Sequence, residues 1–296
     1  MNLSAAISVL LASACATPIL AQSLPGNPVL SGWIELEQVF GGFGDERFLA
    51  ADVTLKLRPA AMNGFGFDLG VKGVQTQDIS FSALYATVVM PLAGGELSFG
   101  MPRSALREIF GSRPMAGGQA ADLELGILSQ ADYLTTVDLM IGLDTYGLRY
   151  DNTYGALRVS AGLYKVDDAD AAQVAVEYAL SDTKLRFGVE TLSNDFETVT
   201  NLVLGGSQTL GKLELTGVLR HLDSGMFAAD TFRLDADYRV TDAVTVSASY
   251  LTASEAMDDF YGLSADYTFT KTAYVQAGVL MVGGDNLYDV SLGVKF

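Results

Sequence analysis

The feature that most constrains this sequence is a strict alternation of apolar and polar residues. The stretch LAADVTLKLR (49–58) places Leu49 and Val53 on one face and Asp52 and Lys56 on the other. Successive side chains of a strand point to opposite faces, so alternation over such lengths predicts β-strands. The pattern recurs at 31–40, 64–73, 154–164, 172–180, 183–191, 213–221, 231–240, 244–251, 261–269, 273–281 and 287–296. With the less regular runs near 77–91, 94–102, 143–152 and 196–210, the sequence predicts sixteen strands.

The connections between these strands differ on the two sides of the predicted sheet. Every other connection is a short turn, such as LSDT, LGK or FTKT, and those between are mostly longer and acidic, such as GGFGDE, KVDDADAA, SNDFET and GGDN. Short turns on one side and long loops on the other are typical of an outer-membrane barrel, whereas a soluble β-sandwich has no reason to segregate its loops.

The width of a sixteen-strand closed sheet decides which face points inward. Such a lumen is too wide for side chains to fill, so it holds water and the charged face lines it. The apolar face then meets lipid, and closure satisfies every backbone polar group without an edge strand. The sequence therefore predicts an all-β protein, a closed transmembrane antiparallel barrel in which 287–296 pairs with the first strand.

Composition agrees with this fold and excludes several classes of function. The net charge of −17 excludes nucleic acid as a partner. Hydrophobic residues make up 49% of the 296-residue chain, with a mean hydropathy of +0.28, yet after the first residues no run is long enough for a spanning helix. The only cysteine, Cys15, falls in the N-terminal segment, which excludes disulfide staples and zinc–thiolate sites from the remainder.

The first 21 residues are predicted to be a secretory signal peptide, followed by one barrel domain over 22–296. They are uncharged, with an apolar run from Ala5 to Ala14, and cleavage is expected after Ala21, although the segment lacks the usual basic start. The alternatives are a buried N-terminal helix, or a lipoprotein signal in which Cys15 is acylated.

One connection is far longer than the others. It covers about 103–142, between the fifth and sixth strands, and a loop of this length is usually functional. We expect it to fold back into the lumen, and the alternative is a surface loop over the barrel mouth. Its apolar segment LELGIL (123–128) is the one part that could plug the pore.

The stretches GELSFGMPRSALREIFG, LDTYGLRYDNTYGALRVSAGLY and the aromatic ending YDVSLGVKF resemble general bacterial porins of the Gram-negative, α-proteobacterial type. The resemblance implies an integral protein of the outer membrane, in contact with the lipid bilayer. It also implies a homotrimer of water-filled pores through which small hydrophilic solutes and ions diffuse passively.

The same resemblance implies a pore constriction, where acidic residues of the inserted loop face basic residues of the wall. A few fixed charges select ions by sign there, because low-dielectric walls focus the field. The acidic candidates are Asp122 and Glu124, with Glu108 ranked below them. The basic candidates, lumen-facing by alternation, are Lys56, Arg58, Lys72, Arg149, Arg158 and Arg186.

Three arginines complicate this assignment, because the first half of the loop is itself basic. Arg103, Arg107 and Arg113 could pair instead with lumen acids, and the candidates for this pairing are Glu35, Glu37 and Asp52. The alternative for any single residue of the constriction is an ordinary solvated lumen charge.

Two further signals concern metals and catalysis. Asp167, Asp168 and Asp170 offer several oxygens to Ca²⁺ but lack EF-hand spacing, so a solvated acidic tip is the alternative. The acidity of the external loops also suggests divalent-cation bridging to lipopolysaccharide. His221 is the only histidine and no serine has a nucleophile context, so we expect no enzyme, no catalytic residue and no cofactor.

Three functions stay open from the sequence. The first is a non-specific diffusion porin that prefers cations because of the acidic balance. The second is a substrate-selective channel, for which Trp33 and Tyr274 are the clear inward-facing aromatic candidates. The third is a non-conducting structural or adhesive barrel that the long loop plugs.

Overall fold

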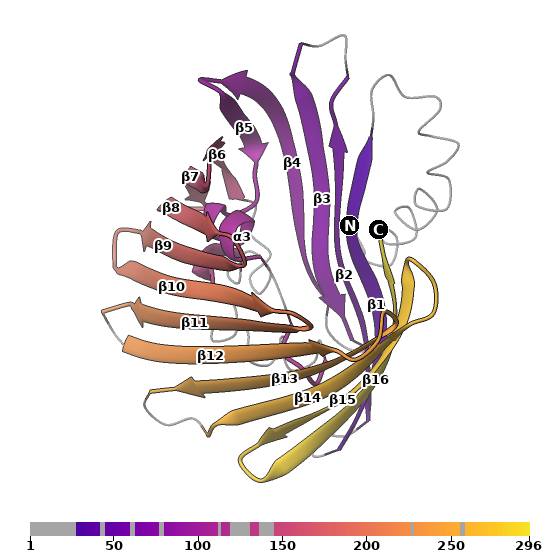
Figure 1. Cartoon of the computed structure of the whole chain (residues 1–296). Helices are drawn as coiled ribbons and strands as arrows, with labels where there is room; N and C mark the ends of the chain where they lie inside the picture. Colours follow the sequence, from indigo (N-terminus) through magenta and orange to yellow (C-terminus); the bar gives the residue numbers. More distant parts are fainter. Residues whose placement is uncertain are drawn as a thin grey trace.

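The protein is a closed antiparallel β-barrel of sixteen strands, each hydrogen-bonded to its neighbours in sequence order (Figure 1). The computed structural model describes residues 28–41, 45–59, 63–76, 80–111, 114–118, 131–135, 145–225, 228–254 and 258–296. The predicted fold class and strand number are thus confirmed. The predicted signal peptide, residues 1–21, lies outside the described residues and stays a prediction.

The strands begin and end within a few residues of the predicted positions. They are β1 (Val29–Gly41), β2 (Glu46–Leu57), β3 (Gly66–Gln75), β4 (Ser80–Leu92), β5 (Gly95–Met101), β6 (Thr145–Tyr154), β7 (Leu157–Val166), β8 (Ala169–Leu180), β9 (Thr183–Ser193), β10 (Thr198–Leu210), β11 (Leu213–Asp223), β12 (Ala228–Arg239), β13 (Val244–Ala253), β14 (Phe260–Thr268), β15 (Ala273–Val282) and β16 (Asp285–Lys295). The α-helix α3 (Ala105–Phe110) lies in the long connection between β5 and β6.

The barrel closes where β16 pairs with β1, the yellow and indigo strands that lie side by side in Figure 1. The register runs from Trp33 opposite Lys295 to Gly41 opposite Leu287. The sheet therefore has no open edge, which is the condition for a β-structure to cross a bilayer. The predicted role of 287–296 as the closing strand is confirmed.

The two faces of the wall have opposite character, as the alternation predicts. Outward-pointing side chains include Leu163, Phe99 and Leu36, which are 63%, 59% and 55% exposed although they are apolar. Their inward-pointing counterparts include the buried polar residues Ser160 and Asn201. An apolar outer band around a polar lumen is the pattern of a transmembrane barrel.

Two connections are shorter than the sequence suggests. KVDDADAA and GGDN were expected to be among the longer loops, but β7 and β8 are joined by Asp167 and Asp168 alone, and β15 and β16 by Gly283 and Gly284. Asp167 and both glycines have positive φ, so these are tight hairpin turns whose flanking residues belong to the strands. None of the helices in the described part of the chain is long and apolar enough to span a membrane.

The outward face generates a prediction about lipid contact. Leu219, in the middle of β11 and 51% exposed, faces outward. Leu219→Arg should lower the free energy of unfolding in lipid vesicles by about 2–4 kcal/mol, because a charge is placed in hydrocarbon. Denaturant titration measures this. Thr216→Arg, on the lumen side of the same strand opposite Asp235, is the matched control, and an equal loss from both variants would contradict the assignment of the faces.

Candidate functional site

The short helix α3 carries the charged residues that make the candidate constriction. The sequence SALREIFG starts the helix at Ser104, whose Oγ accepts a hydrogen bond from the Arg107 amide at 3.3 Å. Gly111 ends it at φ 76°, and its amide donates to the Arg107 carbonyl at 2.8 Å. The residues that flank the helix thus supply both of its caps, so local sequence determines where the helix begins and ends.

The apolar face of α3 packs against the inner wall. Leu106 and Ile109 are buried with Ala175 of β8 and Val203 of β10, and Phe110 packs against this cluster. Glycines on the wall allow the close approach: a Cβ at Gly188 would lie 3.0 Å from the Phe110 ring, and one at Gly205 would lie 2.9 Å from it. The helix is thereby held on one side of the lumen.

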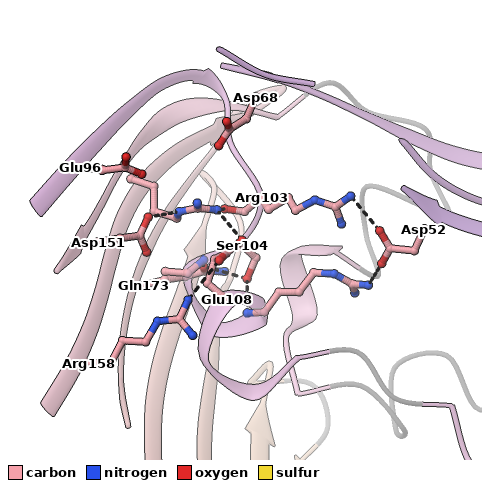
Figure 2. Close-up of polar contacts among 12 residues, drawn as sticks. Asp52, Asp68, Glu96, Arg103, Ser104, Glu108, Asp151, Arg158 and Gln173 are labelled. Carbon is pink, nitrogen blue, oxygen red and sulfur yellow. Dashed lines mark hydrogen bonds and ion pairs between the residues drawn. The ribbon is translucent and has the colours of Figure 1, made fainter. Parts of the chain in front are cut away.

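Polar wall residues fix the start of α3. The Ala105 amide donates to Gln173 Oε1 at 2.7 Å and to the Tyr164 hydroxyl at 2.9 Å, and Ser104 Oγ donates to Gln173 Oε1 at 3.0 Å. Figure 2 shows Ser104 and Gln173 side by side below Arg103. Gln173 and Tyr164 were missed from the sequence, where they are only two inward-facing polar residues among many.

On one side of α3, two arginines reach the opposite wall (Figure 2). Arg103 Nη2 lies 2.8 Å from Asp52 Oδ1, and Arg107 Nη2 lies 2.5 Å from Asp52 Oδ2. Burial opposes the charged form of Arg107, yet Asp52 and Asp132 together outweigh burial and raise the arginine pKa. The predicted alternative, in which loop arginines pair with lumen acids, is therefore found for Asp52.

On the other side, Glu108 meets basic residues of β6 and β7. Its carboxylate oxygens lie 3.3 Å from Arg149 Nη1 and 3.3 Å from Arg158 Nη2. Burial raises the pKa of Glu108, but Arg149, Lys56 and Arg158 together lower it below the ordinary value. Arg149 also donates to the Arg103 carbonyl at 2.9 Å, which ties the loop start to the wall.

Two further described pieces of the long connection lie against other parts of the inner wall. Near β12 and β13, the Pro114 carbonyl accepts from Arg233 at 3.0 Å and the Ala116 amide donates to Ser249 at 2.9 Å. Near β9, the amides of residues 133 and 134 donate to the buried Glu190 carboxylate at 2.8 and 2.9 Å. The described pieces of the connection thus lie inside the barrel and narrow it.

The predicted site residues fall into three groups. Glu108, Arg149, Arg158 and Lys56 gather on one side of α3, and Lys72 lies beside Asp52 on the other. Arg58 instead pairs with Asp68 and Glu96, and Arg186 with Glu177, away from the helix. Asp122, Glu124 and Arg113 lie outside the described residues. Glu108, ranked below the other two acids in the sequence, is the one with described basic partners.

The acidic turn after β7 shows no metal-binding arrangement. Asp170 pairs with Lys165 at 3.2 Å, and the same ammonium donates to the Asp168 carbonyl at 3.1 Å. Among the described residues, no group of three or more His, Cys, Asp or Glu side chains is placed to hold a metal ion. The calcium site at Asp167, Asp168 and Asp170 stays a prediction.

Comparison with known proteins gives one family. A family model described as Gram-negative porin matches residues 6–287. No curated protein matches the sequence significantly.

Solved structures with the same fold are distant in sequence. A mutant of the Rhodopseudomonas blastica porin has a TM-score of 0.66 at 16% identity, covering 91% of this chain and 100% of its own. OmpT of Vibrio cholerae with one loop deleted has a TM-score of 0.69 at 15% identity, covering 92% and 100%. Another porin has a TM-score of 0.68 at 18% identity, covering 91% and 100%. These likenesses show the fold.

The pairing of Asp52 with Arg107 predicts a large cost when the carboxylate is removed. Asp52→Asn keeps the shape but removes the paired carboxylate from Arg107, which is 5% exposed. We expect the free energy of unfolding to fall by about 3–5 kcal/mol in guanidinium titrations. Asp68→Asn is the control, because its partner Arg58 is 26% exposed and also contacts Glu96. That change should cost no more than about 1 kcal/mol, and equal losses would count against the site.

The lowered pKa of Glu108 predicts an acid-sensitive contact. Its ordinary value is 4.5, so its stabilising contribution is fully present above about pH 4.5 and is lost as the pH falls through the lower folded value. The stability difference between the native protein and Glu108→Gln should be constant from pH 7 to about 4.5 and shrink below it. Unfolding titrations at each pH measure this, and a difference that already shrinks between pH 7 and 5 would contradict it.

Proposed function

The chain belongs to the Gram-negative porin family and is therefore a diffusion channel of the outer membrane, and we propose that it passes small hydrophilic solutes with a preference for cations. The members of this family are channels rather than enzymes, and the barrel around α3 gives the chain the corresponding architecture. The finer points, which are the sign of the preferred ion and the oligomeric state, form the proposal.

The charge of the lumen wall carries the proposal of cation preference. The inner faces of β12–β16 and β1 present more carboxylates than cations. Their carboxylates are Glu35, Glu37, Asp235, Asp237, Asp266 and Asp289, against the cations Arg233, Arg239 and Lys295. On the other side of the lumen, Asp52 and Glu108 compensate basic residues by direct pairing. The net field along the pore should therefore attract cations.

Single-channel recording in a planar bilayer tests this proposal. With a KCl gradient across the bilayer, we expect stepwise increases in conductance as channels open, and a reversal potential of the sign that indicates cation selectivity. Arg158→Gln should shift that potential further toward the cation value, because Arg158 is 39% exposed inside the lumen. Lys165→Gln, an outward-facing residue at the end of β7, is the control and should leave it unchanged. A reversal potential that indicates anion selectivity would contradict the proposed cation preference, but it would still agree with a diffusion channel.

We also propose a homotrimer whose external loops contact lipopolysaccharide. The resemblance to general porins supports the trimer. Acidic residues in the connections predicted to be external, such as Asp167 and Asp168 between β7 and β8, support bridging by divalent cations. Conductance steps in groups of three are expected. Treatment with EDTA should lower the melting temperature of the assembly if divalent cations bridge it to lipopolysaccharide, and an unchanged temperature would contradict bridging.

One observation favours the second candidate function, a channel with a solute-binding site. The inward-facing aromatic residues Trp33 and Tyr274 line the same cavity, together with several carboxylates. This cavity lies on a part of the wall that α3 does not cover.

A further inference from the structure

A cavity of about 210 Å³ lies between the loop residues Pro114–Ala116 and the inner faces of β1 and β12–β16. Met115 closes it on the loop side, where its side chain is buried with Leu251 and Leu280. A space of this size holds several water molecules or a small organic solute. It is separate from the charge network of α3, with which it shares no lining residue.

The cavity is strongly acidic. Its lining includes the carboxylates of Glu35, Asp235, Asp237 and Asp266, and the only cation on its described lining is Lys295. Asp235 is partly compensated by Arg233, which lies 2.9 Å away, whereas Asp237 accepts a hydrogen bond from Ser247 at 2.5 Å. The four carboxylates outnumber Lys295 and Arg233 together, so the cavity favours a further positive charge.

Glu35 supplies an independent sign of a missing partner. Its side chain is 2% exposed, and its Oε2 accepts a hydrogen bond from the Tyr274 hydroxyl. Its Oε1 is buried and makes no hydrogen bond of good geometry, although the Ser291 hydroxyl lies close to this carboxyl group. A buried carboxylate oxygen without a donor is costly, and a bound cation that donates N–H groups would remove the cost.

One aromatic ring of the cavity already contacts an ammonium group, that of Lys295. Its ammonium lies 4.2 Å from the centre of the Tyr274 ring, in a cation–π contact. Trp33 offers a second aromatic surface beside it. The described residues contain no group that could hold a metal ion, whereas the carboxylates and aromatic rings suit an organic ammonium.

We propose that this cavity is a binding subsite for small organic ammonium ions, above all for linear diammonium ions. One ammonium group would lie near Glu35 and the aromatic rings, and the other near Asp235 and Asp237. The inference rests on the proposed function in one respect, which is that the cation enters through the lumen.

Tryptophan fluorescence tests the subsite directly, because Trp33 is the only tryptophan of the chain and lines the cavity. The full-length protein in detergent is titrated with 1,4-diaminobutane at pH 7 and constant ionic strength. We expect a saturable change in emission. Neither 1,4-butanediol, which is a neutral molecule of similar shape, nor an equal ionic strength of KCl should produce it.

Variants of both charge signs sharpen the test. Glu35→Gln should raise the half-saturating concentration about tenfold, since a single charge contact is lost. Asp266→Asn should raise it as well, which covers the case in which the first variant does not fold. Lys295→Gln should lower it, because a competing ammonium is removed. Glu96→Gln is the matched control, a lumen carboxylate on β5 that does not line the cavity.

The outcomes separate this proposal from the proposed function. A saturable response with the expected order of variants supports the subsite, even if the protein conducts no ions, in which case the channel proposal fails alone. The subsite is overturned if the native protein shows no saturable response, if butanediol gives the same response, or if Glu35→Gln and Glu96→Gln weaken binding equally. Open, cation-selective channels with no fluorescence response would leave the channel standing.

Discussion

The whole structure depends on one constraint: each backbone N–H and C=O group inside a bilayer needs a partner within the protein. A sheet meets it only by closing on itself, and here closure is the pairing of β1 with β16 from Trp33 to Gly41. Once the sheet is closed, the alternation of apolar and polar residues decides which side chains point outward and which point into the lumen. Residues such as Leu36 and Leu292 meet lipid, and the residues between them line the lumen. The polar interior is therefore a consequence of the same pattern that makes the strands.

Closure with sixteen strands creates a second requirement, because the wall alone cannot fill the space that it encloses. The long connection narrows that space from within. It is held by apolar contacts at α3 and at Met115, and by buried hydrogen bonds to Gln173, Glu190 and Ser249. These contacts lie on different parts of the wall, so the described pieces of the connection are fixed separately. The channel is shaped by where a connection is anchored rather than by the strands themselves.

The sequence predicted the barrel, the number of strands and which face of the sheet is apolar, because a period of two is a local property. It did not predict which charges meet. Glu108 has described basic partners because α3 packs closely over Gly188 and Gly205, and these glycines carry no sequence signal that links them to a helix some 80 to 100 residues earlier. Arg186 is lumen-facing as expected, yet Glu177 on the neighbouring strand takes it as a partner. Pairing is decided by the path of the loop and by adjacent strands, and neither can be read from alternation. The length of the connection between β7 and β8 was also overestimated from the sequence, because the positive φ of Asp167 allows a tight turn there.

The arrangement of charges around the loop has a consequence for selectivity. Where α3 lies, each strong charge has an opposite partner within a few ångströms: Arg103 and Arg107 with Asp52, and Glu108 with Arg149 and Arg158. Paired charges largely cancel at a distance, so this network positions the loop more than it sets the sign of the field. In the cation-preferring channel that we propose, the sign is set along β12–β16 and β1, where carboxylates outnumber cations. On this proposal, the residues that position the loop and those that set the ion preference lie on different parts of the wall. A change at the acidic wall should therefore alter the ion preference more than a change at α3, where an altered charge changes the position of the loop as well.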